Sequence, residues 1–271
     1  MKHKNDQWRV WNEMASYGEV LYKRASGEAP EMESSKAAAR RLSGILQPGA
    51  RLLDVGCGAG HYLRSLRNAY PFPFSYTGVD ATKNYLDLAK RAFSADPDAA
   101  FVHGEIENLP VEDQSFDVVI CMNVLLHLPR IVPAIRELWR VTKGTLLIRT
   151  LVGQTGFRIQ QVREWETAEQ RQESGSDDPL FDEDGEPRRF HYFNIYSEAY
   201  IQWIASTLSG VSGFQLTPDA DFNPDALSAT HWPDADKPRD LTRVLGGQQV
   251  NGSILEPWTF IRFDRLKAAP G

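Results

Sequence analysis

The chain has 271 residues, of which 42% are hydrophobic and 24% charged, and its net charge is −6. This is ordinary globular composition, and the length suffices for one large domain with insertions or for two small domains. No apolar run approaches the roughly 20 residues of a membrane-spanning helix, and residues 1–12 lack the apolar core of a secretion signal. We therefore expect a cytoplasmic protein without a membrane partner.

Strands and helices alternate regularly between residues 34 and 150. The hydrophobic periodicity predicts a first helix over 34–46, with a pair of serines able to cap its start. The strands predicted next are 51–55, 75–79, 100–103, 116–122 and 145–150. The helices between them are predicted over 61–70, after a capping Thr82, and over 131–141. This alternation indicates a parallel sheet covered by helices on both faces.

The regular alternation ends after residue 150. The elements predicted beyond it are a helix from Ser197 to Ser206, a strand beginning at 214–216, a long loop over 218–250 and a final strand over 258–263. Tyr196, Tyr200 and Trp203 share one helical face, so we expect them to pack into the core. We interpret 151–196 and 218–250 as insertions in one domain.

The negative charge is concentrated in one segment. Residues 164–187 contain ten acidic residues and one basic residue, a charge of −9 that leaves +3 for the rest of the chain. We expect this segment to be a solvated surface lid or loop, and recognition of a basic substrate is the alternative. No long basic run or alternation of basic and aromatic residues is present, so nucleic acid is not an expected partner.

The first predicted strand runs into a glycine-rich turn, Asp54-Val55-Gly56-Cys57-Gly58-Ala59-Gly60. Glycines allow a sharp turn and a close approach of backbone to ligand, and the following helix N-terminus attracts an anion. The G-x-G-x-G spacing differs from the G-x-G-x-x-G of dinucleotide sites and lacks the Gly-Lys-Ser/Thr ending of a phosphate-binding loop. An acid at position 54 suits a ligand that carries an ammonium group.

Four stretches resemble the class I S-adenosylmethionine (SAM)-dependent methyltransferases, and most closely the small-molecule branch with the ubiquinone/menaquinone-type enzymes. They are LLDVGCGAGHYL at 52–63, YTGVDAT at 76–82, GEIENLP at 104–110 and SFDVVICMNVLLHLP at 115–129. The resemblance covers about residues 35–150. It implies an α/β, Rossmann-like, doubly wound and mostly parallel sheet of seven strands in the order 3-2-1-4-5-7-6, with the last strand antiparallel and insertions after strands 5 and 6.

The same resemblance implies which residues bind the cofactor. The glycine turn would pass under the methionine part of SAM, Asp80 would accept the ribose hydroxyls, and Asn123 would lie near the sulfonium. Glu105 would accept from the adenine amine at a place where the family more often has Asp. The residues implied in cofactor binding are Asp54, Gly56, Cys57, Gly58, Gly60, Asp80, Ala81, Glu105, Ile106, Met122 and Asn123. For Asp54 and Asp80 alone, capping of a turn or helix is the alternative.

Two histidines are candidates for a catalytic base, although methyl transfer does not require one. His127 follows the fourth strand, where the family places residues that face the transferred methyl group. His191 lies in the segment that would cover the pocket. A structural role, capping or packing a turn, is the alternative for His127.

Aromatic residues are enriched in two further segments. We expect residues 1–33 to form an N-terminal helical lid, with Tyr17 or Tyr22 shaping it, and residues 34–271 to form the methyltransferase domain. The cluster Phe190, Tyr192, Phe193, Tyr196, Tyr200 and Trp203 either walls a substrate pocket or packs on the sheet.

Cys57 and Cys121 are the two cysteines of the chain. Neither has a Cys or His neighbour at metal-ligand spacing, so we expect two reduced, buried residues and no metal site. The resulting hypothesis is a SAM-dependent methyltransferase that methylates an O, N or C atom of a small-molecule acceptor, as a monomer or homodimer. The alternatives are a non-catalytic SAM-binding sensor or assembly protein, and a methyltransferase acting on protein or RNA.

Overall fold

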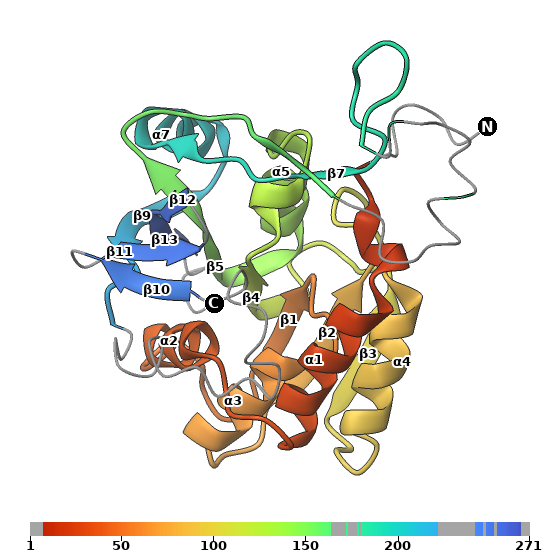
Figure 1. Cartoon of the computed structure of the whole chain (residues 1–271). Coiled ribbons are helices and arrows are strands. Elements are labelled where there is room, and N and C mark those ends of the chain that lie inside the picture. The colour runs from red at the N-terminus through yellow and green to blue at the C-terminus, as the bar shows by residue number, and fades with distance from the viewer. Residues whose placement is uncertain are drawn as a thin grey trace.

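The computed structural model describes residues 8–163, 172, 178, 180–221, 242–245, 248–251 and 254–266. Its centre is one large sheet whose main strands follow the order β3-β2-β1-β4-β5-β13-β9 (Figure 1). Their bounds are β1 (Arg51–Val55), β2 (Ser75–Asp80), β3 (Ala99–His103), β4 (Phe116–Met122), β5 (Thr142–Gly153), β9 (Val211–Pro218) and β13 (Trp258–Arg265).

The direction of the strands confirms the predicted topology. The pairs among β1 to β5 are parallel, while β13 is antiparallel to both β5 and β9. Counted along the sheet, this is the order 3-2-1-4-5-7-6 with the last strand antiparallel. The short strand β8 (Tyr196–Ser197) adds a parallel pairing at the end of β5.

Alternate residues of the central strands bury opposite faces of the sheet. In β4, Val119 and Cys121 pack toward one core, and Val118 and Ile120 toward the other. A period of two with both faces apolar is what a covered parallel strand requires. The first core includes residues of α5 (Val132–Val141) and α7 (Glu198–Thr207); the second includes residues of α2 (Glu33–Arg41) and α3 (His61–Ala69).

Two helices complete the layers on the β1–β3 side of the molecule. Helix α1 (Ala15–Ser26) packs against α3 and against α4 (Lys83–Ala92), and Figure 1 shows it running beside them. A 3-10 turn, η2 (Val10–Glu13), precedes α1, and a second one, η3 (Leu125–His127), follows β4. Residues 8–13, which precede α1, therefore lie near the carboxyl ends of β1, β2 and β4.

The helix predicted over 34–46 differs from expectation in its end and in its cap. Helix α2 ends at Arg41, and turns follow it, although Leu42 and Leu46 are buried as the pattern predicted. The serines do not cap it, because Met32 is the N-cap and the Ser35 hydroxyl donates to the Met32 carbonyl at 2.8 Å. A serine one turn inside a helix satisfies a nearby carbonyl instead of the free N–H groups.

The expected core role of Tyr200 and Trp203 is wrong. Helix α7 buries Ile201, Ile204 and Ala205, whereas Tyr200 is 36% and Trp203 51% exposed. The two rings stack on each other at 5.7 Å between centroids. The aliphatic stripe of the helix packs on the sheet, and the aromatic stripe therefore faces outward. The predicted cap by Ser197 is confirmed, since its hydroxyl accepts from the Tyr200 N–H at 3.2 Å.

The expected loop over 218–250 contains strands where it is described. β10 (Thr242–Leu245), β11 (Gln248–Asn251) and β12 (Ile254–Glu256) form a small antiparallel sheet. Gly246 and Gly247 stand between β10 and β11, a dipeptide typical of hairpins. In the other insertion, β6 (Gln160–Val162) pairs with β7 (Phe190–Tyr192). Of the acidic stretch 164–187, residues 164–171, 173–177 and 179 lie outside the described residues, as do residues 222–241. None of the described helices is long and apolar enough to cross a membrane.

Candidate functional site

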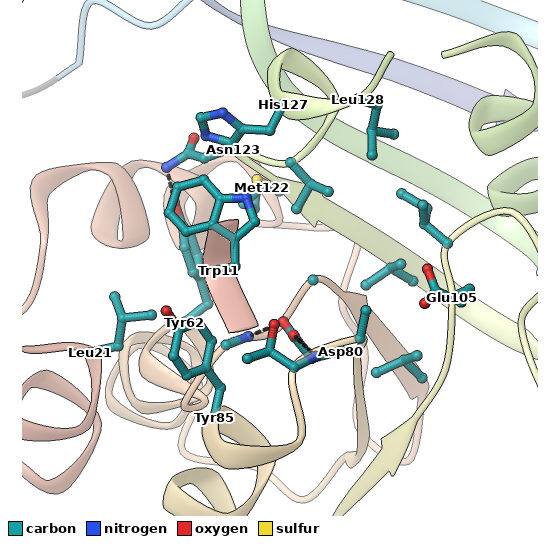
Figure 2. Close-up of a pocket in the computed structure, with 18 of the residues that line it drawn as sticks. Trp11, Leu21, Tyr62, Asp80, Tyr85, Glu105, Met122, Asn123, His127 and Leu128 are labelled. Carbon is teal, nitrogen blue, oxygen red and sulfur yellow. Dashed lines mark hydrogen bonds between the residues drawn. The ribbon is translucent and has the colours of Figure 1, made fainter. Parts of the chain in front are cut away.

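A cavity opens at the carboxyl ends of β1, β2 and β4 and holds about 1120 Å³ of empty space, including its open mouth. Figure 2 shows Asp80 and His127 at opposite ends of this cavity, with Trp11 between them. The predicted residues that line it are Gly56, Gly58, Asp80, Ala81, Glu105, Ile106, Met122, Asn123 and His127. Asp54, Cys57, Gly60 and His191 are not among the lining residues.

The glycine turn after β1 needs glycine for both conformation and space. Gly56, Gly58 and Gly60 have φ of 78°, 54° and 82°, which L side chains rarely adopt. A Cβ at Gly56 would lie 2.2 Å from Val124 Cγ2, and one at Gly58 would lie 2.9 Å from Leu21 Cδ1. The bare backbone of this turn therefore forms a cradle on the cavity floor that a side chain would fill.

Asp80 ends β2 and faces the cavity. Its Oδ2 accepts from the Gly58 N–H and its Oδ1 from the Thr82 N–H, both at 2.8 Å. Burial raises the pKa of this carboxyl, while the two N–H donors act in the opposite direction. The Thr82 side chain is a further hydrogen-bond partner of this carboxylate. An ionised carboxylate has about four acceptor positions, so these three donors leave about one for a ligand. Asp80 thus holds the glycine turn and can still accept a hydrogen bond from a ligand hydroxyl.

Asp54 and Cys57 lie behind the turn. The Asp54 carboxylate is 1% exposed and accepts from the Tyr76 hydroxyl at 2.7 Å. Burial raises its pKa to about 7. Cys57 and Cys121 are free and buried, as predicted, and burial raises the pKa of both thiols well above the usual value. These residues support the cradle from below, where the sequence alone could not separate support from contact.

Glu105 meets a residue that the sequence gave no reason to select. Arg9 donates from Nη1 to both Glu105 carboxylate oxygens, at 2.9 and 3.1 Å, and its guanidinium lies over the Trp8 ring. Trp8, Arg9, Trp11, Tyr17 and Leu21 all line the cavity. The first segment of the chain therefore covers the site. Of the two tyrosines expected to shape it, Tyr17 is a lining residue, while Tyr22 packs under Arg91.

His127 lies at the other end of the cavity. Its Nδ1 is 2.8 Å from the carbonyl oxygen of Tyr192. A carbonyl can only accept, so Nδ1 carries the hydrogen and the neutral ring presents a bare Nε2. Burial lowers the pKa of His127 to about 4. The Trp11 ring packs edge-on against the imidazole at 4.8 Å between centroids.

His191 lies behind His127. The two rings are 5.3 Å apart, and Arg163 Nε donates to His191 Nδ1 at 3.1 Å. Burial lowers the pKa of His191 to about 2. The aromatic cluster around it was expected to wall the pocket or pack on the sheet. None of its six members is a lining residue, and Tyr192 instead fixes His127 through its carbonyl.

Another lining histidine has an unpaired nitrogen. His61 begins α3, is 9% exposed, and its Nδ1 has no hydrogen-bond partner among the described residues. Burial lowers the pKa of His61 to about 3. An orphaned buried nitrogen beside the glycine cradle fits a site that is completed by a ligand.

The doubly wound sheet, the glycine cradle after β1 and the carboxylate ending β2 define the class I methyltransferase fold. Residues 53–148 match the family described as "Methyltransferase domain". The chain therefore contains a class I SAM-dependent methyltransferase domain, and this family implies SAM as its cofactor. The cradle, the acceptor position left on Asp80 and the orphaned His61 nitrogen all fit that ligand.

Related proteins agree with this assignment. The demethylmenaquinone methyltransferases of Staphylococcus epidermidis and Staphylococcus aureus are 34% identical over 98 residues, which cover 36% of this chain. The same 98 residues cover 41% of each relative, so the chain spans about two fifths of their length. The sequence similarity to these relatives therefore covers about a third of this chain.

Solved structures extend the likeness in fold to most of the chain. A SAM-dependent methyltransferase of Methanosarcina mazei has a TM-score of 0.51 at 17% identity, covering 83% of this chain and 97% of that one. The putative methyltransferase in a Haloferax volcanii complex with the Trm112 methyltransferase activator has a TM-score of 0.55 at 16% identity, covering 94% and 96%. These structures share the fold.

Proposed function

We propose that this protein transfers the methyl group of SAM to an O, N or C atom of a small-molecule acceptor. The observation that supports it is that the two ends of the cavity differ. One end has the glycine cradle with Asp80, and the other has the neutral imidazole of His127. Such a cavity can hold a nucleoside at the first end and an acceptor at the second.

In this proposal the bound cofactor supplies the activated methyl group and a neutral leaving group. The backbone of Gly56 and Gly58 and the carboxylate of Asp80 bind it. Ala81, Ile106 and Met122 add apolar or backbone contacts along the same wall. Alignment of the acceptor and exclusion of water then account for most of what the protein must contribute.

His127 would orient the acceptor. Its bare Nε2 accepts a hydrogen bond from an O–H or N–H group, and the Tyr192 carbonyl holds the ring in that tautomer. A pKa of about 4 keeps the ring neutral at neutral pH, so its role is to accept a hydrogen bond and orient the acceptor rather than to hold its proton. His191 packs against the His127 ring and would help to hold its orientation.

The N-terminal segment favours a small acceptor. Trp8, Arg9 and Trp11 cover the cavity, and the ion pair between Arg9 and Glu105 ties this cover to the opposite wall. A covered cavity excludes water and admits a metabolite more readily than a folded macromolecule.

Calorimetry with SAM tests cofactor binding. We expect the wild-type protein to bind SAM, and Asp80→Ala to weaken binding by roughly ten- to a hundredfold, because hydrogen bonds to a charged group are lost. Gly58→Val should abolish binding by filling the cradle. Gly44→Ala, a change at an open position outside the cavity, is the control. Absence of wild-type binding, or equal binding by both site variants, would contradict the proposal.

The acceptor class needs a separate experiment. The protein is incubated with methyl-labelled SAM and a metabolite extract, with the Asp80→Ala variant as control. We expect label in the low-molecular-weight fraction with the wild type only. Label that appears only on protein or RNA would replace the small-molecule acceptor with a macromolecule, and SAM binding without any product would indicate a sensor.

A further inference from the structure

A buried ion pair lies next to the cavity but outside its lining. Arg149 of β5 donates from Nε and Nη2 to Asp219 Oδ2, at 2.7 and 2.6 Å, and the two side chains are 2% and 1% exposed. The guanidinium also lies 4.0 Å from the centroid of the Trp258 ring. Burying two charges is costly, and an apolar pair of the same volume is often at least as stable. Stability alone therefore does not explain this pair.

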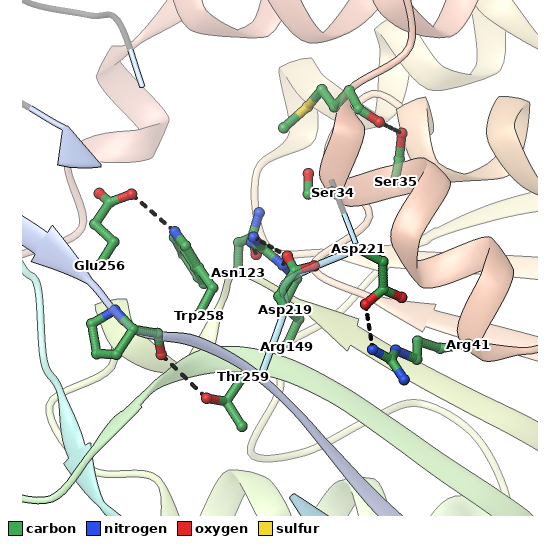
Figure 3. A network of polar contacts seen from close by, with 12 residues as sticks. Ser34, Ser35, Arg41, Asn123, Arg149, Asp219, Asp221, Glu256, Trp258 and Thr259 are labelled. Atoms are coloured by element: carbon green, nitrogen blue, oxygen red, sulfur yellow. Dashed lines mark hydrogen bonds and ion pairs between the residues drawn. The ribbon is translucent and has the colours of Figure 1, made fainter. Parts of the chain in front are cut away.

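The third arm of the guanidinium reaches the cavity wall (Figure 3). Arg149 Nη1 donates to Asn123 Oδ1 at 2.6 Å, and the Asn123 N–H donates to the Arg149 carbonyl at 2.9 Å. A guanidinium has only donors, so the amide oxygen of Asn123 must face it. Asn123 Nδ2 therefore faces Tyr62 Oη, 3.3 Å away, and the Tyr62 hydroxyl donates to Ser34 Oγ at 3.2 Å. Each hydrogen-bond direction in this series is determined by Arg149.

Asn123 is held in an unusual conformation. Its φ is 60°, a region that residues other than glycine rarely adopt. Arg149 binds both its main chain and its side chain. Asn123 and Tyr62 line the cavity, whereas Arg149 and Asp219 do not. Two polar groups of the cavity wall thus depend on an ion pair that a ligand in the cavity does not need to touch.

We propose that Arg149 is a positioning residue, which uses Asp219 as its counter-ion to hold Asn123 and Tyr62 in the arrangement that binds SAM. This inference rests on the proposed function, because it concerns the same ligand. It adds that two residues beyond the matched region 53–148, Arg149 of β5 and Asp219 after β9, control the cavity wall that binds SAM.

The charge balance of the pair gives a specific readout. SAM carries a positive sulfonium that its product, S-adenosylhomocysteine (SAH), lacks. In the wild type, Asp219 neutralises Arg149. Asp219→Asn would leave an uncompensated positive charge behind the wall and would disfavour SAM relative to SAH. For unit charges about 10 Å apart at an effective dielectric constant of about 20, the affinity ratio shifts by roughly tenfold.

Three variants of the full chain separate positioning from charge, with affinities for SAM and SAH measured by calorimetry. Arg149→Lys keeps the charge but cannot bond Asp219 and Asn123 at the same time, as the guanidinium does. The affinities for SAM and for SAH should therefore fall by a similar factor, about three- to tenfold, with their ratio unchanged. The double variant Arg149→Met with Asp219→Leu removes both charges and should show the same uniform loss. Asp219→Asn should lower the SAM/SAH affinity ratio about tenfold. Arg262→Met, which removes an arginine paired on β13, is the matched control.

A measurement without ligand keeps the outcome decisive. In NMR spectra of the ligand-free protein, the Asn123 side-chain amide should be protected from exchange in the wild type and the Arg262→Met control, and exposed to exchange in the double variant. Wild-type affinities and an unchanged Asn123 amide in the double variant would overturn the inference. If the wild type binds neither SAM nor SAH, the proposed function fails first, whatever the amide shows. If Asp219→Asn does not fold, the other two variants still decide.

Discussion

Three carboxylates near the cavity have different tasks because their partners differ. Asp54 is sealed under the glycine turn against Tyr76, Asp80 faces the cavity while holding two backbone N–H groups, and Glu105 is paired with Arg9. All three side chains carry the same functional group, a carboxylate. The number of free acceptor positions, and therefore the capacity to bind a ligand, is set by the neighbours of each residue.

The buried carboxyl of Asp54 predicts a pH-dependent contribution to stability. Its pKa is about 7 in the folded protein, above the ordinary value near 4 of the unfolded chain, so the folded state binds the extra proton between these values. The stability contributed by the protonated carboxyl is present below about pH 4 and is lost as the pH rises to about 7. Asp54→Asn should therefore gain stability relative to the wild type over this range, by up to about 1.4 kcal/mol per pH unit.

Urea unfolding of wild type and Asp54→Asn at pH 5 and pH 8 measures this difference. The Tyr76 hydroxyl can still donate to the asparagine oxygen, so the hydrogen bond is kept. Asp87→Asn, which removes a carboxylate with a 78% exposed side chain, is the control and should follow the wild type. A difference between Asp54→Asn and wild type that does not change with pH would contradict the prediction.

At the scale of elements, the turn between β1 and α3 combines backbone conformation with close packing. Gly56 has a positive φ and faces Val124 at the end of β4, so the β1–α3 turn and the β4–η3 turn fit against each other. Gly44 has a similar φ of 74° but no atom within 4 Å of a built Cβ. Substitutions at these two glycines therefore distinguish the stability lost through an unfavourable backbone conformation from the stability lost through a steric overlap with Val124.

Gly44→Ala should lower the free energy of unfolding by about 1–2 kcal/mol, the cost of a left-handed alanine. Gly56→Ala should cost about 1–3 kcal/mol more, because its Cβ also overlaps Val124. Denaturant unfolding measures both, and calorimetry should show loss of SAM binding only for Gly56→Ala. Adding Val124→Ala to Gly56→Ala should recover part of the stability. Equal costs for the two glycine changes would show that the contact with Val124 is unimportant.

The sequence predicted the elements whose burial follows a simple period. β1 and β4 were predicted with the observed bounds, since an apolar strand buried on both faces differs clearly from its polar flanks. The cap and bounds of α7 were predicted well, but its outward aromatic stripe was wrongly predicted to be the core face. α2 ends at Arg41, before its predicted end, because the buried Leu42 and Leu46 that extended the pattern lie in the turns that follow it. β10 and β11 were missed because prolines, aspartates and glycines dominate the surrounding segment.

For the candidate site, sequence reasoning found the residues that belong to local motifs. Gly56, Gly58, Asp80, Glu105 and Asn123 were all predicted to lie together, and they line one cavity. The contributors from distant parts of the chain carried no motif. Arg9 meets Glu105 across 96 positions, and Arg149 meets Asp219 across 70. Such pairs are products of tertiary packing, which periodicity and motif spacing do not encode.

Across the whole molecule, the N-terminal segment packs against the first insertion beside the cavity. Trp8 packs against Tyr192, and Trp11 against His127 and His191, so segments that precede and follow the matched region 53–148 contact each other. This packing covers His127 and His191, while His61 is buried at the start of α3. Burial lowers the pKa values of His61, His127 and His191 to about 3, 4 and 2.

These histidines predict acid destabilisation of the whole fold. In the unfolded chain their pKa is near 6.5, so between about pH 6.5 and pH 4 the unfolded state binds up to three more protons than the folded state. Stability is therefore complete above about pH 6.5 and falls as the pH drops, by up to about 4 kcal/mol per pH unit, which exceeds the opposing contribution of Asp54. Urea unfolding between pH 4.5 and pH 7 should show this slope. His191→Gln should reduce it by about a third, whereas His103→Gln, on the exposed end of β3, should retain it. Stability that stays constant or rises on acidification would mean that burial does not hold the three rings neutral.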